Sequence, residues 1–281
     1  MATVSVLMVT YNHPKFIADS INSLLRQSET DWELLIVDDS ETVKTQQVLD
    51  SFLPNPRIHY FYRGRKMGYA NALNYALDRA QGRYIAILDD DDVWLDEQKL
   101  KKQINFMDGN VDYIVCGGRY IELNEATHNM TCISGPTTDE AIRSRMLICN
   151  GFVNSSTLYR RSTFRYDENS IRHTADWELW LRLGKKGKFY NFDEYFTVYR
   201  IWPKGGTSIN AKEHVTDRFL LVWRYRKDYP GSMRGLMVAC LRWIDVRMPE
   251  FMRLMILKIL SPVINSIRSW LYPGTQRLAR E

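Results

Sequence analysis

The chain has 281 residues and a formal net charge of +5, and 45% of its residues are hydrophobic and 25% charged. This is the composition of an ordinary globular protein, which excludes a disordered chain, and the charge is too small to indicate nucleic-acid binding. None of the four cysteines forms a CxxC pair with another, so we expect neither a zinc site nor a disulfide framework.

The first part of the chain alternates short apolar runs with helical patterns. The apolar runs, which predict strands, span residues 4–9, 33–37, 57–62, 84–88 and 113–116. The helical patterns lie between them, over residues 14–26, 42–52, 69–80 and 97–107. This alternation predicts βαβ units, and the continuous apolar character of the strands predicts a mostly parallel sheet with helices on both faces.

The pattern is looser after about residue 125. Helices are predicted over 141–147, 176–183 and 211–226, and strands over 155–159 and 196–199. Residues 231–281 contain two further helical patterns, 233–248 and 250–271, with eight Lys or Arg against three acidic residues. This last segment therefore carries the whole net charge. We divide the chain into segments 1–125, 126–230 and 231–281.

Polar side chains follow three of the predicted strands at the point where each strand ends. They are Thr10–Tyr11–Asn12, Asp38–Asp39–Ser40 and the quartet Asp89–Asp92. Because ligands of such sheets bind beyond the carboxyl ends of the strands, we expect these residues to line one binding rim. Four adjacent carboxylates repel one another unless a cation neutralises them, which favours Mg²⁺ or Mn²⁺ at the quartet. The alternative is a solvated acidic turn that caps the next helix.

Nucleotide-binding motifs of two large classes are missing from the sequence. There is no GxGxxG after the first strand and no GxxxxGK[ST], so neither a dinucleotide-binding Rossmann site nor a phosphate-loop NTPase is supported. Asp39 stands where a strand-end acid accepts hydrogen bonds from a ribose or base. A plain helix cap shared with Ser40 is the equal alternative for this residue.

Two segments resemble the inverting family 2 glycosyltransferases of the GT-A fold. They are VSVLMVTYNHPKFIADSINSLLRQSETDWELLIVDDS and YANALNYALDRAQGRYIAILDDDDVW, and the likeness extends from Val4 to about Arg200. It implies an α/β, Rossmann-like and mostly parallel sheet flanked by helices, followed by a C-terminal helical tail. It also implies that 1–125 bind a nucleotide-sugar and that 126–230 hold the acceptor and catalytic base. The charge and helical patterns of 231–281, which lie beyond the resemblance, predict a basic amphipathic tail.

The resemblance also implies a set of site residues. The residues placed around the nucleotide or its sugar are Thr10, Tyr11, Asn12, Asp39, Asn74, Asp89 and Asp90. Aligning LDDDDVW with the DxD motif of the family makes Asp91 the metal ligand. The catalytic base maps to Asp176, although the preceding Glu of the family is Ala175 here. The alternative for Asp176 is a first-turn acid favoured by the helix dipole.

One loop departs from the family. Relatives often carry a His where Trp202 stands, and that His can touch the metal. A tryptophan cannot ligate a metal, so either water fills the position or Lys204 neutralises the diphosphate. The five histidines, His13 among them, show no spaced cluster, and we interpret them as ordinary polar residues.

The activity implied by the resemblance is a metal-dependent, hexosyltransferase-type transfer from a nucleotide-sugar, of which a UDP-sugar is the expected kind, to an acceptor hydroxyl. The expected setting is glycan, cell-surface polysaccharide or glycolipid biosynthesis, with a glycan or lipid-linked acceptor and no nucleic-acid partner. A sugar-phosphate nucleotidyltransferase is the alternative enzyme, but the first strand lacks its Gly-rich basic loop. A non-catalytic sugar-nucleotide-binding protein is the third possibility.

The tail, 231–281, has three interpretations. Its apolar residues suit a protein core, a dimer interface, or a helix lying at the surface of an anionic membrane. No apolar run reaches the roughly 18–20 residues of a spanning helix, and the first residues lack the basic and apolar regions of a signal peptide. We therefore expect a cytoplasmic protein. On the third interpretation, the tail provides a peripheral contact with the cytoplasmic membrane face.

Overall fold

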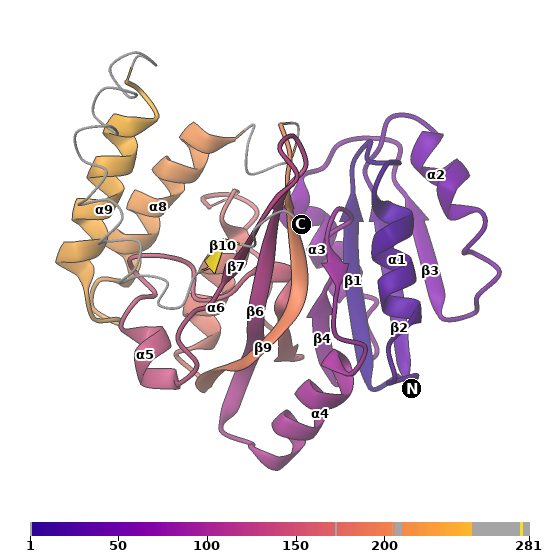
Figure 1. Cartoon of the computed structure of the whole chain (residues 1–281), viewed down its shortest axis with the longest axis horizontal. Coiled ribbons are helices and arrows are strands. Elements are labelled where there is room, and N and C mark those ends of the chain that lie inside the picture. Colours follow the sequence, from indigo (N-terminus) through magenta and orange to yellow (C-terminus); the bar gives the residue numbers. More distant parts are fainter. Residues whose placement is uncertain (1, 172, 204, 206–209, 249–275, 278–281) are drawn as a thin grey trace.

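The described residues fold around one ten-stranded sheet flanked by helices (Figure 1). The computed structural model describes residues 2–171, 173–203, 205, 210–248 and 276–277. The strand order is β10-β7-β6-β8-β4-β1-β2-β3, and β9 pairs with both β5 and β6. This is the α/β fold that the sequence predicts.

The first four strands are parallel, as expected. They are β1 (Val4–Thr10), β2 (Trp32–Asp38), β3 (Ile58–Tyr62) and β4 (Tyr84–Ile87), in the order β3-β2-β1-β4. Side chains of β1 alternate between two cores. Leu7 and Val9 share one core with the helix α3 (Tyr69–Leu77), while Val6 and Met8 face α1 (Ile17–Leu25). Because successive side chains of a strand point to opposite faces, a strand covered on both sides is apolar throughout.

The remaining strands pair in a mixed manner. β8 (Leu158–Arg160) lies antiparallel between β4 and β6 (Tyr113–Asn124), β7 (Asn129–Ile133) is antiparallel to β6, and β9 (Lys188–Ile201) is parallel to β6. The sheet is thus parallel in its first part and mixed beyond β4, where the long pairing of β6 with β9 is again parallel and the shorter pairings are antiparallel. The predicted α/β sheet is confirmed, with antiparallel strands added to its parallel part. The turn between β6 and β7 is short, and a short turn joins only antiparallel neighbours.

Two very short strands complete the sheet. β5 (Val93–Trp94) follows the aspartate quartet and pairs antiparallel with β9, and β10 (Gln276–Arg277) pairs antiparallel with β7. Since β8 of the second segment lies between β4 and β6 of the first, the sheet runs through the expected boundary near residue 125. The division into 1–125, 126–230 and 231–281 stays a prediction.

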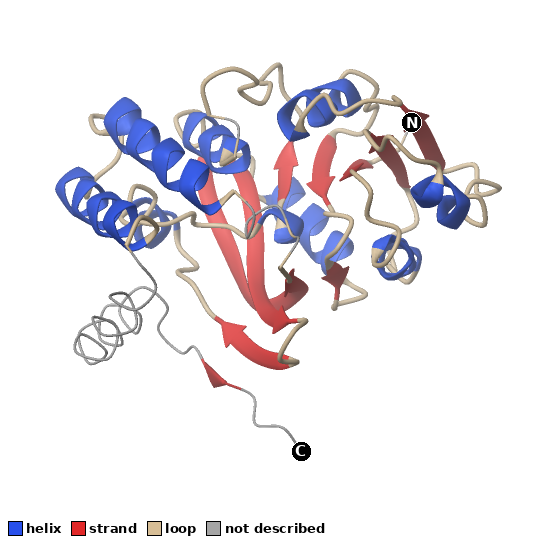
Figure 2. Cartoon of the chain, turned by 90° about the horizontal axis from the view of Figure 1, so that it is seen from above, coloured by secondary structure: helices blue, strands red, loops and turns tan. Residues whose placement is uncertain are grey.

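Helices cover both faces of the sheet (Figure 2). Besides α1 and α3 they are α2 (Lys44–Leu49), α4 (Lys99–Gly109), α5 (Asp139–Arg143), α6 (Ala175–Leu183), α8 (Ala211–Tyr225) and α9 (Ser232–Asp245), with a 3₁₀ turn at Asn154–Ser156. The predicted helix at 141–147 is shorter and begins earlier than expected. The predicted helix at 233–248 corresponds to α9, whereas the one at 250–271 lies outside the described residues.

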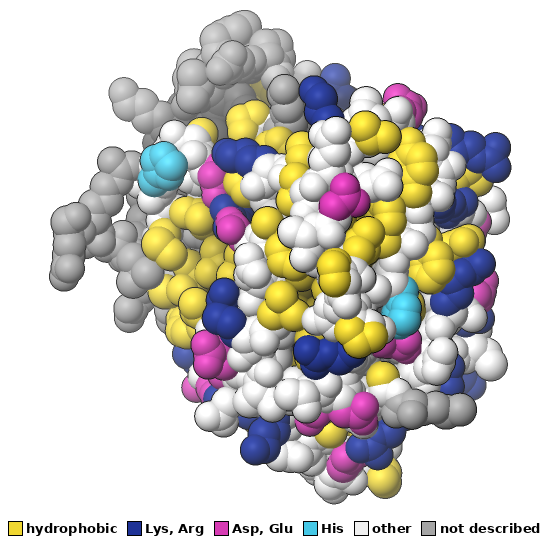
Figure 3. All heavy atoms as spheres, turned by 90° about the vertical axis from the view of Figure 1, so that its right-hand side faces the viewer, with side chains coloured by type: hydrophobic (Ala, Val, Ile, Leu, Met, Phe, Trp, Pro, Cys, Tyr) yellow, Lys and Arg dark blue, Asp and Glu magenta, His cyan; other side chains and the backbone are white. Residues whose placement is uncertain are grey.

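The surface over α1, α2 and β3 mixes acidic and basic side chains instead of gathering one sign of charge (Figure 3). Among the described helices, none combines the length and the apolar character that crossing a bilayer requires.

Candidate active site at the strand ends

The polar ends of β1 and β2 are joined directly. The amide of Asp39 donates to the Thr10 carbonyl at 3.0 Å, and the amide of Asn12 donates to Ser40 Oγ at 2.7 Å. The second bond holds Asn12 in the left-handed region, with φ of 57°, which asparagine tolerates better than most residues. The polar ends of the first two strands therefore lie together at one edge of the sheet, as expected, and their role in binding stays a prediction.

Asp39 organises the loop that enters α3. Its Oδ2 accepts hydrogen bonds from the amides of Met67 (2.9 Å) and Gly68 (3.1 Å), and Arg63 Nε lies 3.6 Å from Oδ1. Gly68 has φ of 95°, a conformation that favours glycine. Burial raises the pKa of Asp39, and the Met67 amide and Arg63 oppose that rise.

The loop of residues 63–68, which we call the basic loop because it contains two arginines and a lysine, lies beside the predicted nucleotide residues. Lys66 Nζ is 4.5 Å from the centre of the Tyr11 ring. Arg63, on the same loop as Lys66, approaches Asp39. Asp39 Oδ1 is buried and has no hydrogen-bond partner within the described residues. An aromatic face, a carboxylate oxygen without a hydrogen-bond partner and nearby cations suit a base and its phosphates.

The two outer aspartates of the quartet are held by hydrogen bonds. Asp89 accepts from Tyr69 OH at 2.6 Å and from Asn154 Nδ2 at 3.1 Å. Asp92 is fully buried and accepts from Ser155 Oγ at 2.5 Å and from the amide of Arg200 at 3.0 Å. Asp92 therefore ties the acidic turn to β9 and to the loop before β8.

The two inner aspartates form a cluster with His13. His13 Nδ1 lies 3.2 Å from Asp90 Oδ1, and Trp202 Nε1 donates to Asp91 Oδ2 at 2.8 Å. One possible ligand atom from each of His13, Asp90 and Asp91 lies within 4.8 Å of the other two. Asp90 Oδ2 is buried and has no partner among the described residues. This donor set fits a divalent cation.

The raised pKa values of the aspartates also favour a bound cation at this cluster. Desolvation raises the pKa of both Asp89 and Asp91 to about 6, and the neighbouring aspartates add to the rise. Desolvation also raises the pKa of Asp90, which His13 opposes. Carboxylates that repel one another in a desolvated site are stabilised by a bound cation.

Asp176 reaches the same site from the other half of the chain. It lies in the first turn of α6, where Asn150 Nδ2 donates to its Oδ2 at 2.8 Å. Desolvation raises its pKa to about 6, the charge of Asp89 contributes, and the Trp177 amide and Asn150 oppose the rise. Asp176 and Asp89 are thus close enough to repel, although 87 positions separate them. A carboxylate with this pKa suits a general base near neutral pH.

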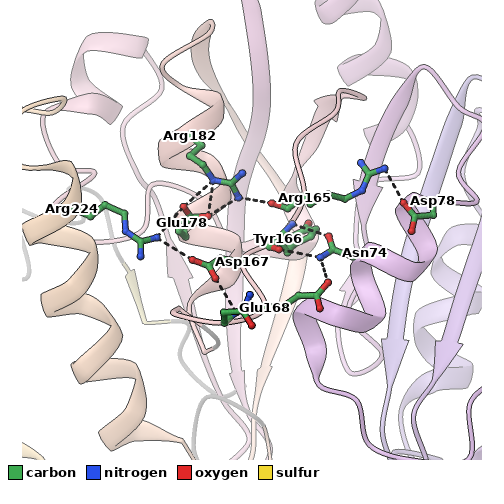
Figure 4. A pocket seen from close by; sticks show the side chains of 10 residues that line it. Asn74, Asp78, Arg165, Tyr166, Asp167, Glu168, Glu178, Arg182 and Arg224 are labelled. Atoms are coloured by element: carbon green, nitrogen blue, oxygen red, sulfur yellow. Dashed lines mark hydrogen bonds and ion pairs between the residues drawn. The ribbon is translucent and has the colours of Figure 1, made fainter.

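Asn74 lies differently from the other predicted nucleotide residues. Its amide donates to the Tyr166 carbonyl (3.0 Å) and to Glu168 (2.6 Å), and its oxygen accepts from the Tyr166 amide at 2.8 Å. It lines a pocket of about 590 Å³ whose other labelled residues include Arg165, Asp167 and Arg224 (Figure 4). Asn74 therefore fastens α3 to the loop before α6, and its nucleotide role stays a prediction. Lys204, the expected diphosphate contact, lies outside the described residues.

Several residues of the site were not identified from the sequence. They are His13, Tyr69, Asn150, Asn154 and Ser155. His13 had one available signal, because it stands three residues beyond the end of β1, on the same rim. The others come from α3 and from the loop before β8, and no sequence pattern links them to the quartet.

Comparison with known proteins identifies the family. The sequence profile described as "Glycosyl transferase family 2" matches residues 5–167. The chain is 35% identical over 203 residues to TuaG of Bacillus subtilis, which is named as a teichuronic acid biosynthesis glycosyltransferase, covering 70% of this chain and 79% of TuaG. The chain belongs to glycosyl transferase family 2.

A second relative of this glycosyltransferase is WfgD of Escherichia coli. It is 31% identical over 183 residues, with 65% of this chain and 70% of WfgD covered. Its name is UDP-Glc:alpha-D-GlcNAc-diphosphoundecaprenol beta-1,3-glucosyltransferase. Relatives in two bacteria are therefore named for cell-surface polysaccharide and glycolipid synthesis.

Solved structures agree on the fold of the glycosyltransferase. TarS of S. aureus, residues 1–349 with UDP-GlcNAc, superposes with a TM-score of 0.66 at 16% identity, covering 89% of this chain and 77% of that one. The mannosyltransferase PcManGT of Pyrobaculum calidifontis, solved with GDP-Man and Mn²⁺, gives 0.66 at 13% identity over 96% and 83% of the two chains. At these identities the likeness establishes the GT-A fold alone.

Proposed function

We propose that the protein is an inverting, metal-dependent glycosyltransferase that transfers a hexose from a UDP-sugar to an acceptor hydroxyl. The observation that carries the proposal is the position of Asp176, a desolvated carboxylate whose pKa of about 6 reflects both burial and the charge of Asp89 at the metal-binding rim. A base beside the donor-binding acids is the arrangement that a direct displacement requires.

The donor side consists of the basic loop, Tyr11 and Asp39. Tyr11 presents an aromatic face to the base. Oδ1 of Asp39, which makes no hydrogen bond within the described residues although Arg63 lies 3.6 Å away, accepts a hydrogen bond from the base or ribose. Asp91 and Asp90 would hold Mn²⁺ or Mg²⁺. When bound, such a cation neutralises the diphosphate leaving group. Asp89, fixed by Tyr69 and Asn154, faces the sugar.

Asp176 acts on the acceptor side. It takes the proton of the acceptor hydroxyl as the oxygen attacks the anomeric carbon, and Asn150 keeps the carboxylate oriented through its bond to Oδ2. The diphosphate leaves from the opposite side of that carbon, so the configuration inverts. One carboxylate base suffices for this single displacement.

The substrate class follows from the relatives. WfgD is named for UDP-Glc and a diphosphoundecaprenol-linked sugar, and TuaG for teichuronic acid. We extend these to a UDP-hexose donor and a glycan acceptor carried on a lipid, used in cell-surface polysaccharide or glycolipid synthesis on the cytoplasmic side of the membrane.

A membrane-bound acceptor requires an approach to the lipid surface, and α9 suits this role. Gly235 and Ala239 are its buried residues, and the opposite side exposes Met233, Met237 and Leu241 at helical spacing. Arg247 lies 4.3 Å from the ring centre of the exposed Trp243. Apolar, aromatic and arginine side chains together suit the headgroup region of anionic lipids.

The direct test is turnover of UDP-, GDP- and dTDP-hexoses by the full chain, with Mn²⁺, with Mg²⁺ and with a chelator. We expect release of UDP from one UDP-hexose, dependence on the cation, and formation of the opposite anomer on a lipid-linked acceptor. Absence of both binding and turnover for every nucleotide-sugar would support the non-catalytic alternative. Nucleoside triphosphate consumption with a sugar phosphate would support the nucleotidyltransferase.

A further inference from the structure

His13 is held rigidly at the acidic rim although its ring belongs to a loop. The left-handed turn at Asn12, fixed by Ser40, sets the direction of the chain just before it. The ring packs edge-on against Trp202 with centroids 4.8 Å apart, and Phe16 packs against the same indole at 5.5 Å. This packing directs Nδ1 toward Asp90, and the His13 side chain keeps 21% of its surface exposed.

The cluster around His13 has an unused acceptor. Asp90 is only 6% exposed, and its Oδ2 makes no hydrogen bond of ordinary geometry among the described residues, although the Thr10 hydroxyl lies near the carboxyl and lowers its pKa. Burying an unpaired carboxylate oxygen is costly unless a ligand satisfies it. Two ligands of one ion at about 2.1 Å lie at most about 4.2 Å apart, so the spread of 4.8 Å closes with side-chain shifts below about 1 Å.

Trp202, in the loop after β9, contacts two members of the same cluster. Its indole donates a hydrogen bond to Asp91 Oδ2 and packs against the ring of His13. The loops after β1 and β9 therefore meet at the inner aspartates.

We propose that His13 is a ligand of the divalent cation, together with Asp90 and Asp91, and that it makes the site prefer Mn²⁺ to Mg²⁺. The inference rests on the proposed function, since it concerns the cation of the same site. Imidazole is a good ligand for transition metals, whereas Mg²⁺ prefers oxygen ligands and retains its waters. A histidine among the ligands therefore favours Mn²⁺. Trp202 acts as a positioning residue, because it orients both Asp91 and His13.

The competing explanation is that His13 only neutralises Asp90 as an ion pair. A cation would then displace the imidazole, and removal of His13 would leave cation affinity unchanged or raise it equally for both metals. The two explanations predict opposite results for the same measurements.

The experiment uses the full chain with Mn²⁺ alone and with Mn²⁺ plus UDP. Electron spin-echo envelope modulation of the bound Mn²⁺ should show coupling to an imidazole nitrogen, and labelling histidine with the heavy nitrogen isotope should change it. Calorimetry of His13→Gln should show a loss of Mn²⁺ affinity of at least about tenfold, the scale for losing even an outer partner of a metal ligand. Mg²⁺ affinity should fall by less than about threefold.

His59→Gln is the matched control, because His59 lies on β3 and pairs at 3.8 Å with Glu33, away from the rim. It should retain the nitrogen coupling and both affinities. Mn²⁺ binding without imidazole coupling in the unmutated protein, or equal losses of Mn²⁺ and Mg²⁺ affinity in His13→Gln, would overturn the role of His13 and leave the proposed function intact. If the unmutated protein binds neither cation, with or without UDP, the metal dependence of the proposed function fails as well.

Discussion

Asp176 combines two properties that its position on the helix does not by itself reveal. Desolvation destabilises its charged form, and Asp89 adds repulsion, so its pKa rises from an ordinary 3.8 to about 6. Both effects make the carboxylate a stronger base than a solvent-exposed aspartate. Desolvation and repulsion also lower the stability of the folded protein at neutral pH. Such a destabilising carboxylate is typical of functional sites, where perturbed pKa values cluster.

The variant Asp176→Asn removes both the proton acceptor and the buried negative charge, so it tests the catalytic role and the cost in stability in one protein. Transfer should fall by about 10²–10⁴-fold, the usual contribution of a positioned base, while UDP affinity changes little. At pH 7 the variant should be more stable, because the folded protein no longer holds a desolvated negative charge. The raised pKa of Asp176 sets an upper limit of about 3 kcal/mol on this gain, and contact of the carboxylate with solvent makes the gain smaller. Steady-state kinetics and urea denaturation measure both. A folded variant that keeps more than a tenth of the activity would leave Asp176 as a helix-start acid.

The pH profile gives an independent check of the same residue. Because the base acts when deprotonated, transfer should rise as the pH increases through about 6 and level off above it. The profile is to be measured at saturating donor and Mn²⁺, so that titration of the metal-binding acids does not dominate. A rate that is flat from pH 5 to 8 would contradict a base with this pKa.

Asp91→Asn tests the metal site. Asparagine keeps the shape of the side chain and can still accept from Trp202, but it removes the charge that binds a cation. Mn²⁺-dependent UDP binding should be lost in calorimetry while the fold is kept. Asp112→Asn is the control, because Asp112 forms an exposed ion pair with Lys188 at 3.4 Å, and such pairs contribute little. Unchanged Mn²⁺-dependent binding in Asp91→Asn would remove Asp91 from the site.

At the scale of elements, α9 illustrates how one helix can present two different faces. Gly235 lets α9 approach the Leu147 carbonyl and Val222 closely, and a Cβ placed at Gly235 would lie 2.4 Å from that carbonyl. On the other side, Met233 is 78% exposed, and Met237 and Leu241 are 55% and 54% exposed. The helix is therefore packed through its small residues and displays its large ones.

Replacing Met233, Met237 and Leu241 together with glutamine should weaken binding to anionic liposomes by at least about tenfold, because membrane affinity scales with the buried apolar area. Co-sedimentation measures it. Val111→Gln is the control, since Val111 is equally exposed, at 78%, just beyond α4. Equal binding of the triple variant and the unmutated protein would remove α9 from membrane contact. A change in oligomeric state on size exclusion would instead favour the dimer interpretation.

At the scale of the whole molecule, the acids of the site link folding to pH. Asp89, Asp91 and Asp176 each have a pKa raised to about 6, so between pH 4 and 6 the folded protein holds protons that the unfolded chain has released. These three acids therefore make stability fall as the pH rises through this window, while Lys99, whose pKa burial lowers to about 7, acts in the opposite sense near pH 7. The effect of the three acids is opposite to the behaviour of a salt-bridged aspartate.

Without metal, the melting temperature should therefore be higher at pH 5.5 than at pH 7.5. Mn²⁺ with UDP should raise it most at pH 7.5, because a ligand that binds only the folded state stabilises it by about 2.7 kcal/mol at a hundredfold excess over Kd. Scanning calorimetry of the full chain measures both. Stability that rises steadily from pH 5.5 to 7.5 without metal would show that the three acids are not desolvated in solution.

Local patterns determined the first part of the fold and the family. The continuous apolar strands predicted a sheet covered on both faces, and this prediction succeeds because side-chain periodicity and strand direction depend on neighbouring residues. The family was accessible from motifs in the sequence. The same strand order places Thr10, Asp39 and the quartet at one edge of the sheet, whereas their roles, and that of Asp176, stay predictions.

The tertiary structure alone decided the pairing of the later strands and the partners of each carboxylate. The sequence around the quartet does not distinguish Asp90 from Asp92. In the structure Asp90 lies beside His13 with one oxygen that has no hydrogen-bond partner among the described residues, whereas both oxygens of Asp92 accept hydrogen bonds, from Ser155 and the Arg200 amide. The bonds of Asn74 to the loop at Tyr166 were likewise not foreseen from its motif, and its nucleotide role stays a prediction. Such partners come from segments that are tens of residues apart in the sequence. Packing and strand register set the distances between these segments, and neither produces a periodic pattern of residues that could be recognised in the sequence.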